Sequence, residues 1–292
     1  MFTDPTFLFI QTLNGLQLAM LLFLLSVGLS VVFGLMNFVN LAHGTLYMLG
    51  AYLGLTVYNH TESFWTALAL APLGVMVIGM IFYVTLIKRL QKAPPLKQVL
   101  VTFGLIFVGL DTVRIFWGNL PDAIPQPNLL SSSIQIFGET YPSYRLFIIA
   151  LGLLVMVVLY FGLEKTRIGS IIRAGVDNRE MVSSLGINID LAFFGIFCLG
   201  CYLAGLSGVV AGAVFPVEPG MDMSILILTL IVVVVGGLGS LKGAAVGSLM
   251  IGLAETYGQV FVPEFASVTI YALMVVILLI RPGGLFPVRA ES

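Results

Sequence analysis

Residues 7–35 read FLFIQTLNGLQLAMLLFLLSVGLSVVFGL, an apolar run that contains no charged side chain. A helix needs about 20 apolar residues to cross the hydrocarbon of a bilayer, so this run is long enough to span a membrane. No basic stretch precedes it, and the apolar part continues as a full span rather than ending like a cleavable signal peptide. The run therefore predicts a first transmembrane helix.

The composition extends this interpretation to all 292 residues. Hydrophobic residues make up 59% of the chain, charged residues only 9%, and the mean hydropathy is +1.08. A soluble domain has roughly 25% charged residues, so the composition excludes a soluble globular fold. The apolar runs are too long and too uniform for the strands of a membrane β-barrel. We therefore expect an all-α, polytopic transmembrane bundle, and the net charge of -1 offers no basic face for nucleic acid.

Hydropathy divides the chain into apolar segments whose boundaries are loose by several residues. These segments cover residues 7–35, 44–59, 64–87, 98–118, 145–163, 191–214, 223–241, 244–261 and 266–280. Residues 36–44 could instead form a re-entrant turn, so the span count is eight or nine. The longest connection on the outer side, residues 119–144, holds four prolines.

The distribution of Lys and Arg predicts the orientation of these spans. Cytoplasmic loops of membrane proteins carry an excess of Lys and Arg. With nine crossings, eleven of the thirteen cations share one side: Lys88, Arg89, Lys92, Lys97, Lys165, Arg167, Arg173, Arg179, Lys242, Arg281 and Arg289. The rule then places the N-terminus outside and the C-terminus in the cytoplasm.

Residues 166–188 form a polar, helix-compatible island in this apolar chain. A loop that only joins two spanning helices can be much shorter. The charge distribution places the island in the cytoplasm. An ordered cytoplasmic element of this size indicates a docking surface for another protein.

Glycines are dense near residue 240, where Gly236 and Gly237 are followed by Gly239, Gly243 and Gly247 at four-residue spacing. In lipid this spacing lets helix backbones approach closely, so we interpret these glycines as helix-packing residues. A helix break beside a translocation path is the alternative. The stretch lacks the G-x-x-x-x-G-K-[ST] spacing of a phosphate loop, so we expect this chain to bind no nucleotide and no cofactor itself.

Asn37, Asn40 and His43 recur every three residues after the first span and are followed by Gly44. On a helix the three polar side chains would share one face. Polar side chains at membrane depth are costly unless they find partners or line a wet cavity. We predict that these residues line or gate a translocation path, and the alternative is an interfacial turn whose polar groups cap helix ends.

Few ionisable side chains fall within the spans. Asp111 and Arg114 are three residues apart and can pair across one helical turn, whereas Glu255 stands alone in its segment. An ion-coupled carrier usually needs acidic residues deep in the bilayer, so this pattern weakens a self-contained carrier without excluding it. Two cysteines and two histidines offer no metal-ligand cluster, and we expect no metal site.

Four stretches together carry a resemblance that covers essentially the whole chain. They are residues 34–52 (GLMNFVNLAHGTLYMLGAY), 167–188 (RIGSIIRAGVDNREMVSSLGIN), 235–255 (VGGLGSLKGAAVGSLMIGLAE) and 281–286 (RPGGLF). In these stretches the chain resembles the inner-membrane permeases of ATP-binding-cassette importers of the branched-chain amino-acid type, the LivH subfamily. The combination is far more specific than any one of the motifs.

The resemblance implies a single transmembrane permease domain over residues 1–292 in a bacterial inner membrane. It also implies four kinds of partner: the lipid bilayer, a second related permease, two cytoplasmic ATPases that hold ATP and Mg, and an extracytoplasmic solute-binding protein that docks on residues 119–144. A coupling helix within residues 165–190 would enter a groove of the ATPase, whose cycle would drive alternating access. The residues expected to make this coupling are Gly169, Arg173, Ala174, Asn178, Gly186 and Ile187.

Two functional classes follow: a transporter subunit without enzyme activity of its own, and a self-contained carrier or channel. The polar island favours the first, because a self-contained carrier does not require it. The family default is a branched-chain or other hydrophobic amino acid, while related permeases move urea, short amides and organic acids. The residues alone do not choose among these solutes.

Overall fold

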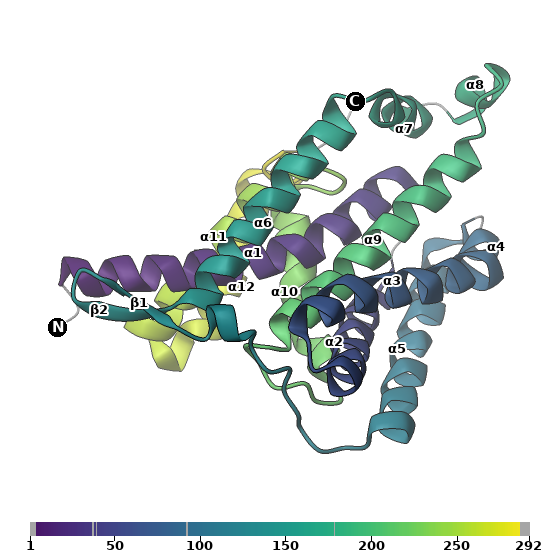
Figure 1. Ribbon diagram of the computed structural model, residues 1–292. Helices are drawn as coiled ribbons and strands as arrows, with labels where there is room; N and C mark the ends of the chain where they lie inside the picture. The colour runs from purple at the N-terminus through teal and green to yellow at the C-terminus, as the bar shows by residue number, and fades with distance from the viewer. Residues whose placement is uncertain (1–3, 37, 39, 92, 178, 287–292) are drawn as a thin grey trace.

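The computed structural model describes residues 4–286 except residues 37, 39, 92 and 178, and they form a bundle of helices (Figure 1). Its long helices are α1 (Pro5–Met36), α2 (His43–Thr61), α3 (Phe64–Phe82), α5 (Pro95–Trp117), α6 (Ser143–Leu159), α9 (Ile189–Ala211), α10 (Met221–Gly236), α11 (Leu241–Phe261) and α12 (Ala266–Ile280). Short helices and turns complete it: α4 (Lys88–Leu90), α7 (Arg167–Asp177), α8 (Arg179–Ser184), the π-helical turns η1 (Tyr83–Ile87) and η3 (Tyr160–Glu164), and the 3-10 turns η2 (Asn128–Leu130) and η4 (Pro263–Phe265). The predicted all-α class is confirmed.

Length and apolarity separate these helices into groups. In the described part of the chain, five helical segments are long and apolar enough to cross a membrane: Pro5–Gly34, Phe64–Leu90, Pro95–Trp117, Ser143–Glu164 and Ile189–Ala211. Met221–Gly236 and Val268–Ile280 are apolar but shorter. Helices α2 and α11 also lie where spans are predicted, but their sequences are less apolar because they carry more polar and small residues.

Two helices form the centre of the bundle. Helix α1 packs against α9, α11, α6 and α10, and α9 also packs against α2 and α3. Both central helices are mostly buried, and Phe23 and Leu25 of α1 are fully inaccessible. By contrast, α3, α5 and α6 expose many apolar side chains, as expected of helices that face lipid.

Helices α2 and α9 cross where small residues meet. A Cβ atom at Gly50 would lie 2.5 Å from the Cα atom of Gly205, and one at Gly208 would lie 2.1 Å from the carbonyl oxygen of Tyr47. No side chain fits at these contacts, so the two backbones touch. Packing between backbones is a usual way to hold helices together in lipid.

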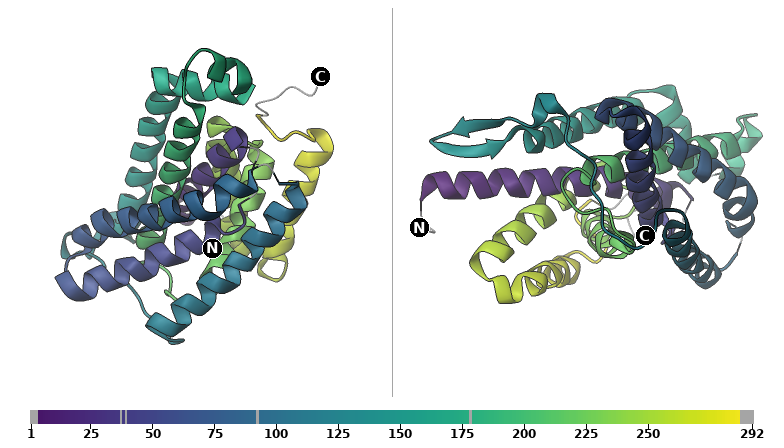
Figure 2. Two further views of the ribbon diagram at one scale, coloured as in Figure 1. Left: turned by 90° about the vertical axis from the view of Figure 1, so that its right-hand side faces the viewer. Right: turned by 60° about the horizontal axis from the view of Figure 1, so that its bottom comes forward.

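The segment predicted as an outer loop contains a β-hairpin, which the sequence analysis did not anticipate. Strands β1 (Ser133–Ile136) and β2 (Glu139–Pro142) pair antiparallel, with Ile134 opposite Tyr141. The turn residues Phe137 and Gly138 both have positive φ angles, 52° and 88°, which is the backbone of a type I′ turn. The Phe137 ring packs edge-to-face on Phe9 near the start of α1, with ring centroids 5.5 Å apart. The hairpin therefore lies beside the N-terminal end of α1 (Figure 2).

Candidate functional site

Helices α7 and α8 lie at the end of the bundle opposite the β-hairpin (Figure 1). Helix α7 is amphipathic. Its buried positions include Gly169, Ile172 and Gly175, whereas Arg173 and Ala174 are exposed. This alternation lets one face of α7 rest on the bundle while the other face remains open.

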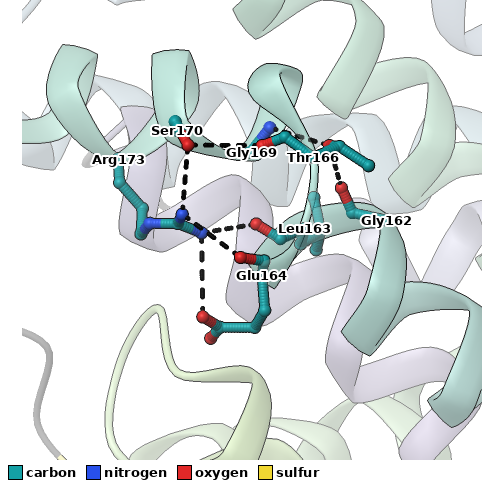
Figure 3. A network of polar contacts seen from close by, with 7 residues as sticks. All are labelled: Gly162, Leu163, Glu164, Thr166, Gly169, Ser170 and Arg173. Carbon is teal, nitrogen blue, oxygen red and sulfur yellow. Dashed lines mark hydrogen bonds and ion pairs between the residues drawn. The ribbon is translucent and has the colours of Figure 1, made fainter.

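The first contact of α7 is with η3, the last turn of α6. A Cβ atom at Gly169 would lie 1.8 Å from the carbonyl oxygen of Leu163, so only glycine fits there. The Arg173 guanidinium donates hydrogen bonds to the carbonyl oxygens of Leu163 and Glu164 and forms a 3.7 Å ion pair with the Glu164 carboxylate (Figure 3). The Thr166 hydroxyl accepts a 3.2 Å bond from the Gly169 amide. Because the last carbonyls of a helix have no partner within it, Arg173 both satisfies them and holds α7 against α6.

The second contact is with the start of α9. A Cβ atom at Gly175 would lie 2.1 Å from Cδ1 of Ile189, so α7 approaches α9 closely. Asn188 begins α9, because its side chain accepts a 3.2 Å hydrogen bond from the Leu191 amide. Ile187 packs beside a small buried cluster that includes Phe193. A displacement of α7 would therefore reach both α6 and α9.

Helix α8 presents apolar side chains to the outside. Met181 is 63% exposed and Leu185 is 70% exposed. Gly186 follows with a φ angle of 80° and open space around it, a conformation that glycine adopts without strain after a helix. Asn178, predicted as a coupling residue, lies outside the described residues. The other predicted coupling residues lie on or directly beside this two-helix surface.

The segment predicted to line the path has a different geometry from the one expected. Asn37 lies outside the described residues, and Asn40 is not helical, because α2 begins only at His43. The prediction that the polar residues share a helical face is therefore wrong for Asn40 and His43. Ala42 is the N-cap residue of α2 and no side chain caps it, so the capping alternative is not seen at this helix start either.

Asn40 and His43 are both deeply buried. The His43 imidazole lies 3.2 Å from the Leu25 carbonyl oxygen in the middle of α1, through its Nε2 atom. A Cβ atom at Gly44 would lie 2.8 Å from the Asp222 carbonyl oxygen, so the start of α2 sits directly against the start of α10. Helix α2 thus begins inside the bundle rather than at its edge.

The glycines near residue 240 bring α10, α11 and the turn between them together. Cβ atoms at Gly236 and Gly243 would each lie 2.2 Å from the other residue's carbonyl oxygen, and one at Gly247 would lie 2.7 Å from the Val232 carbonyl oxygen. Gly237 and Gly239 have positive φ angles of 102° and 81°. These residues therefore combine close backbone contact with a turn that needs glycine.

The intramembrane charges have partners. Asp111 and Arg114 form the predicted pair, with 3.4 Å between Oδ1 and Nη1. Glu255, for which the sequence analysis named no partner, accepts a 2.6 Å hydrogen bond from the Gln259 amide. Among the residues that the structure describes, no group of three His, Cys, Asp or Glu side chains could hold a metal ion.

Sequence reasoning missed a cavity of about 530 Å³ between α1, α10 and α11, which contains several polar side chains and which neither Asn40 nor His43 lines. Three of its lining residues, Gln11, Asn14 and Gln17, recur every three positions in the first apolar run. That spacing is the same signal that drew attention to residues 37–43, so it could have identified the cavity. The uniform apolarity around these amides obscured it.

Comparisons with known proteins identify the family of this chain. The family described as "Branched-chain amino acid transport system / permease component" matches residues 11–278. The permease protein LivH of Salmonella typhimurium is 26% identical over 94% of each chain, and BraD of Pseudomonas aeruginosa is 28% identical over the same shares. The permease protein LivM of Escherichia coli is 26% identical over 94% of this chain and 70% of its own length. No solved structure is significantly similar. The chain belongs to the branched-chain amino acid transport system permease family.

Proposed function

We propose that this chain is a permease subunit of an ATP-binding-cassette importer and forms part of the path for branched-chain or other aliphatic amino acids. The printed names of its relatives support the solute class, because LivH and BraD are both named as high-affinity branched-chain amino acid permeases. A self-contained carrier is the less favoured class. It requires no cytoplasmic docking element, whereas this chain builds one from α7 and α8.

The observation that carries the proposal is the attachment of α7. Arg173 and Gly169 hold this helix against the end of α6, and Gly175 packs against the start of α9. The exposed side chains of Met181 and Leu185 leave an apolar surface on α8 for an ATPase groove. When ATP draws two ATPases together, force on this surface would pass into α6 and α9 and shift the bundle between its two open states.

The orientation and the other partners belong to the same proposal. We place α7 and α8 in the cytoplasm and the β-hairpin outside, in line with the distribution of Lys and Arg. The similarity to both LivH and LivM supports pairing with a second, related permease. The exposed Phe137 and the strands beside it would contribute to the docking surface for a solute-binding protein.

Reconstitution tests this function. The chain is purified with a candidate partner permease, ATPases and a solute-binding protein, placed in proteoliposomes, and assayed for uptake of labelled leucine, urea and organic acids. We expect concentrative leucine uptake that requires both internal ATP and the binding protein. Concentrative uptake by the purified chain alone, without ATPases, would show that it is a self-contained carrier.

A further inference from the structure

The cavity between α1, α10 and α11 is also lined by Arg145 at the start of α6 and by residues between 214 and 218. Its lining residues on α1 fall in the first half of that helix, and Arg145 follows β2 directly along the chain, so the cavity lies toward the hairpin end of the bundle. Its volume of about 530 Å³ exceeds what a single small solute needs. Its lining combines charged and amide groups with aliphatic side chains, a mixture that suits a small amphipathic ligand.

On the cationic side of the cavity, a chain of hydrogen bonds orients Arg145. The Asn14 amide nitrogen donates a 3.1 Å hydrogen bond to Oε1 of Gln11, and its oxygen accepts a 2.6 Å bond from Nη1 of Arg145. These bonds orient the guanidinium at the cavity and leave it other N–H groups for an anion. Gln17, one turn further along α1, is only 5% exposed, and its amide nitrogen has no hydrogen-bond partner among the described residues.

The anionic side comes from α11. Glu255 accepts a 2.6 Å bond from Gln259 at Oε1, while its other oxygen, Oε2, is buried without a hydrogen-bond partner in the described structure. Glu218 also borders the cavity, but it is shared with a smaller cavity that contains Arg114. Gln17 and Glu255 both line this cavity, and each therefore carries a buried polar atom without a hydrogen-bond partner among the described residues, although buried polar groups normally have partners.

We infer that this cavity binds the transported solute as a zwitterion. The solute's carboxylate would accept hydrogen bonds from Arg145 and the Gln17 amide, and its ammonium group would donate to Oε2 of Glu255. An aliphatic side chain would then rest on the apolar part of the lining, made by Leu18, Ile225, Leu228 and Val260. Neutral urea would leave both charges unmatched, and an organic acid would leave the Glu255 carboxylate unmatched. The inference rests on the proposed importer function and assigns the residues of this chain that would recognise the two charged groups of its solute.

Photolabelling tests the location of the site. The complete importer in proteoliposomes is illuminated with photo-leucine, a diazirine analogue that keeps both charged groups, and labelled peptides are mapped by mass spectrometry. We expect labels within residues 11–18, 224–228 or 255–260 that excess leucine suppresses and that Glu255→Gln reduces. Labels confined to other segments, such as residues 40–45, would overturn the assignment.

Transport tests the charge pairing. Glu255→Gln and Gln17→Leu should each raise the leucine concentration that half-saturates uptake by about tenfold, since each removes a hydrogen bond to a charged group. Glu255→Gln should also weaken the preference for leucine over 4-methylpentanoate, which lacks the ammonium group. The matched control is Glu264→Gln, an exposed carboxylate in η4 that does not line the cavity, and it should transport normally.

The two proposals fail in different ways. If the unsubstituted importer shows no ATP-dependent uptake of any amino acid, the importer function is wrong. If it takes up leucine normally and neither cavity substitution changes uptake, with normal amounts of protein in the membrane, only the cavity assignment is wrong.

Discussion

The Thr45 hydroxyl on α2 donates a 3.2 Å hydrogen bond to the Asp222 carboxylate on α10, and both side chains are almost fully buried. The two residues lie 177 positions apart, each in the first turn of its helix. A negative charge near a helix N-terminus is stabilised by the helix dipole, so one carboxylate serves two helix starts. The pair therefore fixes where α2 and α10 meet inside the bundle.

The first prediction concerns this pair. Thr45→Val should lower the stability of the purified protein by about 1–3 kcal/mol, because it removes the hydrogen bond to a buried carboxylate and adds nothing in its place. Thermal unfolding in detergent measures the change. Thr112→Val is the control, since that hydroxyl bonds only to the carbonyl of Val108 in its own helix. If Thr45→Val costs as much in an Asp222→Ala background, which has no side-chain acceptor, the bond is not the cause.

The second prediction concerns the glycines where α2 crosses α9. Gly50→Ala should destabilise the protein by about 1–3 kcal/mol, because its methyl group has no space and must push the helices apart. Gly104→Ala is the matched control, because nothing lies within 4 Å of a Cβ atom at this α5 position. There alanine should be neutral or slightly stabilising, as a better helix former than glycine. Equal melting temperatures for the two variants would contradict the close contact.

The third prediction concerns Gly186 beside α8. Gly186→Trp should abolish ATP-dependent uptake while membrane insertion stays normal, because a large side chain would stand in the proposed ATPase contact and strain a positive-φ turn. Gly118→Trp is the matched control. Gly118 also has a positive φ angle, 88°, and open space around it, but it follows α5 rather than α8. Loss of uptake in both variants would point to backbone strain rather than to docking.

The fourth prediction concerns the anchoring of α7. Arg173→Glu should uncouple the importer, so that ATP is still hydrolysed while uptake falls at least about tenfold, because it removes two bonds to helix-end carbonyls and sets two carboxylates side by side. Arg173→Lys keeps the charge but not the planar fork and should give an intermediate loss. Uptake and ATP hydrolysis are measured on the same proteoliposomes. A proportional loss of both would indicate failed assembly instead.

The fifth prediction concerns orientation. Phe137→Cys should react with a membrane-impermeant maleimide in intact cells, whereas Leu185→Cys should react only after the cells are opened. Both side chains are highly exposed, and the native thiols of Cys198 and Cys201 are buried, which keeps the background low. The reverse pattern would invert the proposed topology.

Much of the fold could be predicted because apolar length is a strong local signal. The segment 7–35, for example, has no charge and becomes α1 within two residues at its start and one at its end. The hairpin at residues 133–142 could not be predicted in this way. It depends on a positive φ angle at Phe137 and on the distant Phe9 ring. Neither can be inferred from the local hydropathy of the sequence.

The candidate site was predicted unevenly for a related reason. The sequence correctly predicted helical structure within the polar island at residues 166–188, because charged residues stand out in an apolar chain. The spacing of Asn37, Asn40 and His43 gave a wrong prediction of a shared helical face, because α1 ends at Met36 and α2 begins only at His43. The partners of Arg173 and Asp222 depend on how separate helices pack, and a single sequence does not contain that information. The partner of Glu255, by contrast, is Gln259, one turn away on the same helix.

The central position of α1 has a consequence for how the protein is made. Helix α1 leaves the ribosome well before two of the helices that cover it, α9 and α11, which begin only at Ile189 and Leu241. Until then its amide-bearing face, which includes Gln11 and Gln17, stays in the bilayer without most of its neighbours. Insertion and assembly are therefore separate stages, and a chain that stops before α11 would reach the membrane with the α11-facing side of its central helix uncovered, open to proteolysis by membrane quality control.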